Sequence, residues 1–179
     1  MNGDKGFTII EMLVAVTIFT LVFGAATGVF VSSLRAQRQS LAYQELLDQT
    51  SYLMEYMSRA IRMAKKDDIE IGGVSLNCLS GDKVNYEFSG QCLKFRNYKN
   101  ECQQFCLNDT RLKETKAGDE NYLTAEDLNV ENFNVTLDGE TQTDNFQPTV
   151  AISLEIEGKE QARIKIQTTI SQRDLDIER

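Results

Sequence analysis

Residues 6–31 form one long apolar run that is interrupted by a single charge. The run reads GFTIIEMLVAVTIFTLVFGAATGVFV, and the twenty residues from Met12 to Val31 carry no charged side chain. A helix needs about 20 apolar residues to cross the hydrocarbon core of a bilayer. Glu11, near the start of the run, is its one acid. Because an acid near the end of a spanning helix is costly without a partner, we expect Glu11 to have a function.

The residues before the apolar run help to distinguish a retained helix from a removed secretory signal. Residues 1–6 are too few and too weakly basic for the n-region of a secretory signal, and Glu11 would be out of place in a signal-peptide core. We therefore predict that the apolar helix is retained in the mature protein. The alternative is a removed secretory signal, since signal peptidase could cut within the small residues of Gly24–Gly28.

The segment from Lys5 to Leu13 reads KGFTIIEML and resembles the cleavage and methylation motif of type IV prepilins and type II secretion pseudopilins. The resemblance implies that a prepilin peptidase/methyltransferase cuts after Gly6, removes residues 1–6 as a leader and methylates the new N-terminus at Phe7. It also implies that the apolar helix stays on the protein and packs against other pilin or pseudopilin subunits.

Cleavage would place Glu11 in a defined position relative to a new positive charge. The freed amine of Phe7 would lie at the start of a helix, with Glu11 one turn away on the same side. The carboxylate could neutralise its own amine or that of a neighbouring subunit, and in a low-dielectric bundle this pair would fix the axial register of one helix against the next. The alternative is that Glu11 extends to the membrane interface and contributes nothing to assembly.

The helical pattern continues beyond the apolar run. We predict one proline-free helix of about 60 residues, in which residues 7–31 form the transmembrane and assembly part and residues 32–66 form the soluble part. The soluble part has apolar or small residues on one helical face, which we expect to be buried: Leu46, Thr50, Leu53, Met57, Ala60 or Ile61, and Ala64.

After residue 66 the pattern changes to short alternating segments separated by turns. Residues 84–88 and 92–96 form a predicted hairpin. Further strands are expected at 111–115, 130–137, 149–156 and 162–170, with a brief helical turn at 124–127. The fold class is therefore α+β and pilin-like, with one long N-terminal helix packed against an antiparallel β-sheet. Residues 67–179 form a β-rich domain that we place outside the cytoplasm.

Three later segments add to the resemblance. The order of residues in 123–133, 147–152 and 168–173 is similar to the C-terminal part of larger minor pilins and J-type minor pseudopilins. This resemblance implies a minor, tip-type or priming subunit. In the apolar helix the chain departs from many major pilins, because Gly24 and Gly28 stand where those have a proline.

The four cysteines, Cys78, Cys92, Cys102 and Cys106, are close together in the predicted extracytoplasmic domain. An even number of cysteines outside the cytosol favours disulfides. Of the three possible connectivities we favour Cys78–Cys92 with Cys102–Cys106, because the latter two would be neighbours on a helix. A metal site with four thiolate ligands is disfavoured by the absence of C-x-x-C pairs, and reduced thiols are the third alternative.

Composition argues against an enzyme. The chain has no histidine, so the commonest component of Ser-His or Cys-His catalysis and of zinc sites is missing. No phosphate loop, nucleophile motif or paired acids are evident, and we expect no cofactor and no metal. The acidic loop Asp138–Asp144 could hold calcium, but a solvated turn is favoured. Residues 67–179 hold twelve Lys/Arg and twenty-two Asp/Glu, so we expect no nucleic acid partner.

Three functions follow from these features. In the first, the chain is a minor pilin or pseudopilin that is inserted in the cytoplasmic (inner) membrane by one span, with its C-terminal domain outside the cytoplasm, and is then assembled into a type IV pilus or type II secretion pseudopilus. In the second, it is a pilus-tip binding module for adhesion, a secreted substrate or DNA uptake. In the third, it is an unrelated secreted or signal-anchored protein.

Overall fold

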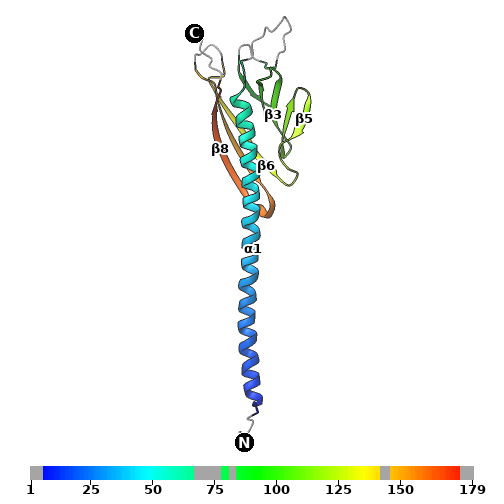
Figure 1. The fold of residues 1–179 in the computed structure, drawn as a ribbon, viewed down its shortest axis with the longest axis vertical. Coiled ribbons are helices and arrows are strands. Elements are labelled where there is room, and N and C mark those ends of the chain that lie inside the picture. Colours follow the sequence, from blue (N-terminus) through cyan, green and yellow to red (C-terminus); the bar gives the residue numbers. More distant parts are fainter. Residues whose placement is uncertain (1–5, 67–77, 81–83, 142–145, 174–179) are drawn as a thin grey trace. The chain divides into compact units, whose positions relative to one another are not determined.

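The computed structural model describes residues 6–66, 78–80, 84–141 and 146–173 (Figure 1). The chain divides into two compact units, residues 1–41 and residues 42–179. The helix α1, Ile9–Arg62, is 54 residues long and contributes to both. Where the sequence predicted a brief helical turn at 124–127, the structure has a turn at 126–127, in which the backbone N–H of Leu128 donates to the Ala125 carbonyl at 3.3 Å.

The first unit is the apolar part of α1. Every residue from Ile9 to Leu41 is exposed, and the helix is long and apolar enough to cross a membrane by length and composition. Threonine hydroxyls in this part are paired within the helix. Those of Thr17 and Thr27 donate to the carbonyls of Val14 and Phe23, both at 2.8 Å. An exposed apolar surface of this extent requires lipid or other helices around it.

In the second unit, α1 buries the face predicted from the sequence. The side chains of Leu46, Leu53, Met57 and Ile61 are between 0 and 3% exposed. Thr50 is also buried, and its hydroxyl donates to the Leu46 carbonyl at 2.6 Å. A polar residue is therefore accommodated on the buried face because the helix itself supplies its partner.

Among the residues of this unit that the structure describes, eight strands form two antiparallel sheets (Figure 1). The five-stranded sheet has the order β1-β2-β3-β4-β5 and the three-stranded sheet has the order β6-β7-β8. The α+β architecture is therefore confirmed, with two sheets where the sequence suggested one. The strands are β1 Tyr86–Ser89, β2 Cys92–Arg96, β3 Cys102–Asn108, β4 Arg111–Lys116, β5 Asp119–Tyr122, β6 Asn129–Asp138, β7 Thr149–Glu157 and β8 Arg163–Ser171.

The two sheets meet where β1 lies beside β6. The backbone N–H of Asn85 donates to the carbonyl of Glu140 at 2.8 Å. The rings of Phe88 and Phe133 pack edge to face with centroids 5.9 Å apart. Both sheets and α1 then contribute to one core, which includes Met57, Phe105 and Ile152.

The C-terminal end of α1 is held by groups from the sheets. The Tyr86 hydroxyl donates to the Ile61 carbonyl at 2.9 Å, and burial raises the pKa of this phenol. The backbone N–H of Arg173 donates to the Arg62 carbonyl at 2.9 Å, and Gln172 Nε2 donates to the Ala64 carbonyl at 3.1 Å. The last carbonyls of a helix need such partners when they are buried, so tertiary contacts take the place of a C-terminal glycine.

We expect Met57→Ala to lower the free energy of unfolding by about 2–5 kcal/mol, because the side chain is removed from a closed core. Met57 is 0% exposed. The matched control is Tyr52→Ala on the same helix, where the side chain is 73% exposed and the change should stay within about 0.5 kcal/mol. Denaturant unfolding of the full chain in detergent measures both. Equal losses would contradict the assigned buried face.

Candidate functional site

The Gly6–Phe7 bond lies in an exposed, non-helical segment directly before α1. A side chain added at Gly6 would meet no atom within 4 Å, and Phe7 is 84% exposed. A peptidase that cuts this bond must bring its own groups close to the backbone, which a glycine permits most easily. The described geometry therefore leaves the bond accessible.

Thr8 and Glu11 form a reciprocal cap at the start of α1. The Glu11 carboxylate accepts hydrogen bonds from the backbone N–H and the hydroxyl of Thr8, both at 3.1 Å. In return the backbone N–H of Glu11 donates to the Thr8 hydroxyl at 3.3 Å. This is a capping box, in which residues three apart satisfy two backbone donors that the first turn of a helix would otherwise leave free.

The capping box was missed in the sequence, although the pattern T-x-x-E before an apolar run is its usual signal. It gives Glu11 a partner in the uncut chain, where the Phe7 nitrogen belongs to a peptide bond and carries no charge. A carboxylate in the first turn is also stabilised by the helix dipole. The pairing of Glu11 with a free amine at Phe7 stays a prediction, because it concerns the cleaved chain.

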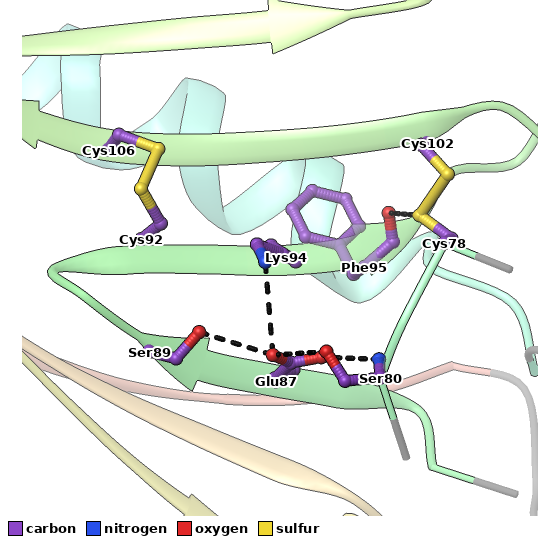
Figure 2. Close-up of polar contacts among 9 residues, drawn as sticks. All are labelled: Cys78, Ser80, Glu87, Ser89, Cys92, Lys94, Phe95, Cys102 and Cys106. Atoms are coloured by element: carbon purple, nitrogen blue, oxygen red, sulfur yellow. Dashed lines mark hydrogen bonds and ion pairs between the residues drawn. A yellow bond between two sulfur atoms is a disulfide. The ribbon is translucent and has the colours of Figure 1, made fainter. Parts of the chain in front are cut away.

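Two disulfides lie on the five-stranded sheet, and they join Cys78 to Cys102 and Cys92 to Cys106 (Figure 2). The favoured connectivity, Cys78–Cys92 with Cys102–Cys106, is therefore wrong. It assumed a helix at 102–106, but these residues belong to strand β3, where a spacing of four separates side chains along one face. Cys92 and Cys106 are instead direct neighbours across β2 and β3, which is the closest placement that two strands offer.

Glu87 ties the segment after Cys78 to the same face of the sheet (Figure 2). Its carboxylate accepts hydrogen bonds from the backbone N–H of Ser80 at 2.7 Å, from the Ser80 hydroxyl at 3.0 Å and from the Ser89 hydroxyl at 3.1 Å. The Ser80 backbone bond is the main reason that the pKa of Glu87 is lowered, and Lys94 Nζ at 3.8 Å adds to the effect. Residues 78–80 are thus attached to the sheet by one disulfide and one carboxylate.

A cavity of about 490 Å³ opens beside the Cys78–Cys102 disulfide. Lys94, Gln104 and Thr115 line it and stand in one row across β2, β3 and β4. A volume of this size can hold a small ligand. The row offers a cation, an amide and a hydroxyl, so it could bind polar groups, but it contains no nucleophile with an adjacent base.

A buried carboxylate lies on the opposite side of this sheet, against α1. Glu114 is 6% exposed and accepts hydrogen bonds from the Tyr56 hydroxyl at 2.9 Å and from Gln103 Nε2 at 2.5 Å. Burial, followed by this hydrogen bond, raises the pKa of Tyr56 to about 12. A neutral donor to a buried carboxylate stabilises packing, and we assign the group a structural role.

Metal binding has limited support in the described residues. Within 6–66, 78–80, 84–141 and 146–173, no group of three or more His, Cys, Asp or Glu side chains could hold a metal ion. The calcium hypothesis for Asp138–Asp144 falls in part on residues 142–145, which lie outside the described residues. It therefore stays untested.

Comparison with known proteins gives one match. Residues 1–27 match the family model described as the prokaryotic N-terminal methylation motif. No curated protein and no solved structure matches the chain significantly. The matched residues include the accessible Gly6–Phe7 bond, the Thr8–Glu11 cap and most of the exposed apolar helix. The matched motif stands at the start of one long helix that antiparallel sheets follow, and in these features the chain is similar to type IV pilin-like proteins.

Proposed function

We propose that this protein is a minor pilin or pseudopilin, a structural subunit that prepilin peptidase processes and that then primes or caps a type IV pilus or type II secretion pseudopilus. The observation that carries the proposal is the methylation motif joined to an exposed apolar helix. A helix with this surface is stable only in lipid or among similar helices. Membrane insertion followed by packing in a filament supplies both environments.

Processing changes the role of Glu11. Cleavage after Gly6 converts the Phe7 nitrogen from a neutral amide into an amine that is a cation at neutral pH. The positive charge then stands at the N-terminus of α1, where the helix dipole disfavours it. Glu11, which Thr8 already holds in the first turn, is the nearest carboxylate that can compensate it. In a bundle of low dielectric constant this pairing selects the axial position of the neighbouring helix.

The parts of the chain take the following roles in this proposal. Residues 1–6 are the leader, residues 7–31 are the transmembrane and assembly segment, and residues 32–66 carry the remaining domain outside the cytoplasm. Two disulfides in residues 78–106 support that location, because disulfides persist in oxidising compartments. The loose resemblance of three C-terminal segments to minor subunits favours a priming or capping position over the filament shaft.

The mass of the membrane-derived chain tests the processing step. We expect a chain that begins at N-methylated Phe7, and we expect Gly6→Ala to accumulate at the uncut length because the added methyl group hinders the peptidase at the backbone. Intact-protein mass spectrometry measures both. A mature chain that begins near Ala26 or Gly28 would instead show a removed secretory signal and would overturn the proposal.

Replacement of Glu11 tests the assembly step. We expect Glu11→Val to leave insertion and cleavage largely intact and to reduce incorporation into filaments, because the amine of Phe7 loses its compensating charge. Thr8→Val is the matched control, since it removes the hydroxyl of the cap but keeps the carboxylate. Quantification of the subunit in sheared filaments and in membranes measures the fraction of the inserted protein that is incorporated into filaments. Normal incorporation of Glu11→Val, or an equal loss in both variants, would contradict the charge-pairing role.

A second function, a pilus-tip binding module, is favoured by the cavity beside Cys78–Cys102. Its polar row presents Lys94 and Gln104 on a sheet that two disulfides hold in place. We expect the double variant Lys94→Gln, Gln104→Ala to separate the two functions. Loss of adhesion, substrate capture or DNA uptake with intact filaments supports a binding module. Loss of filaments supports a purely structural subunit.

A further inference from the structure

Three adjoining cavities surround Met63, directly after the last residue of α1. They have volumes of about 210, 270 and 380 Å³, and Met63 lines all three. Tyr98 is shared by the first two, and Arg62 and Arg173 are shared by the last two. The cavities therefore form one continuous surface feature, which we call the Met63 groove.

The Met63 groove is positively charged in an acidic protein. Five cations line it. They come from α1, from β4 and from the residues that directly follow α1 and β8: Arg59, Arg62, Lys65, Lys116 and Arg173. Among the described residues that line it, Glu55 is the one acid, and it is paired with Arg59 at 2.6 Å. The whole chain has a formal charge of −8, so these cations are concentrated here against the general trend.

The groove is also lined by an apolar side chain, Met63, and one exposed aromatic side chain, Tyr98. Met63 is 41% exposed and Tyr98 is 48% exposed. Lys99 Nζ and Lys116 Nζ each lie 5.8 Å from the centre of the Tyr98 ring. Such distances allow cation–π attraction, so the ring and the cations form one combined surface.

The loop that carries Tyr98 is held in one conformation by its own hydrogen bonds. The Asn97 side chain is 1% exposed, and its Oδ1 accepts hydrogen bonds from the backbone N–H groups of Lys99 at 2.9 Å and Glu101 at 3.0 Å. A loop that is already fixed loses less conformational entropy when a partner binds.

Stabilisation of the helix end explains only part of the groove. Arg59 and Arg62 are in the last turn of α1, where cations interact favourably with the helix dipole. Lys116 belongs to β4. Arg173 supports α1 through its backbone N–H, so its side chain is not needed for that contact. The convergence of these side chains on an exposed methionine and tyrosine therefore calls for a further explanation.

We propose that the Met63 groove is the docking surface for an acidic segment of another protein. Arginine, tyrosine and methionine are the residues that protein interfaces enrich, and the positive charge selects an acidic partner by complementarity. A nucleic acid fits less well, because single-strand binding relies on several stacking aromatics along a basic path and the groove has one exposed aromatic ring. The surface does not depend on cleavage at Gly6, so it stands apart from the proposed processing.

Binding to defined probes by the full chain in detergent micelles tests this assignment. The probes are a fluorescent peptide rich in Asp and Glu that contains leucines, a counterpart with Asn and Gln in place of the acids, and a single-stranded oligonucleotide. We expect saturable binding of the acidic peptide that weakens with salt, and no binding of the neutral counterpart. The double variant Arg62→Gln, Arg173→Gln should lower the affinity about tenfold, and Met63→Gln should lower it severalfold.

The matched control is Arg163→Gln with Lys165→Gln, which removes two exposed cations from β8 and should leave the affinity unchanged. Equal unfolding midpoints of the groove variant and the wild type exclude a general loss of structure. If the control lowered the affinity for the acidic peptide equally, binding would depend only on the net charge of the protein, and the proposal would be overturned. Absent binding, or tighter binding of the oligonucleotide at the same residues, would also overturn it. So would binding that occurs only after Asp174, Asp176 and Glu178 are changed to Asn and Gln, because the chain's own acids would then be the competitor.

Discussion

The burial requirement of α1 is the constraint on which the rest of the protein depends. From Ile9 to Leu41 the helix exposes its side chains all round, and its apolar surface needs an environment that the chain itself does not supply. From Ala42 onward one face is buried, with Leu46, Met57 and Ile61 at 0–1% exposure. Core residues from both sheets cover that face, and a helix of this kind gains most of its stability from tertiary packing. The first part of the same helix is left for lipid or other subunits.

The start of α1 shows how one carboxylate can serve two chemical states of the chain. Before cleavage, the Thr8 hydroxyl and backbone N–H hold Glu11 in a capping box, and the helix begins at a defined residue. Phe7, whose nitrogen processing would free, directly precedes Thr8 in the sequence. The cap therefore gives the Glu11 carboxylate hydrogen-bond partners before its proposed partner exists. Thr8 and Glu11, which form the helix cap, both lie within the sequence motif.

The sequence predicted those features that depend on local periodicity. The buried stripe from Leu46 to Ala64 and the hairpin of β1 and β2 follow from periods of 3.6 and 2 residues. The hairpin turn at Gly90 and Gln91 adopts positive φ values of 57° and 61°, and the twist of such turns matches that of the strands. The division into two sheets was not predictable in this way, because it depends on which strands pair across long distances.

The disulfides were predicted, but their connectivity was wrong and the capping box was not predicted, for different reasons. The error at Cys102 and Cys106 came from the secondary structure, because the run CQQFCLN alternates poorly and was treated as helical. Once β3 pairs with β2, Cys92 and Cys106 become direct neighbours and the connectivity follows. The capping box needed no tertiary information, since Thr8 and Glu11 carry its complete signal.

Charge is distributed unevenly along the chain: the apolar part of α1 from Met12 to Val31 is uncharged, whereas residues 67–179 are acidic. An acidic domain repels other acidic surfaces at long range. The Met63 groove reverses this sign locally, at a place where Tyr98 and Met63 also expose apolar surface. Repulsion elsewhere then improves selectivity, because a wrongly oriented acidic partner meets like charge over most of the surface.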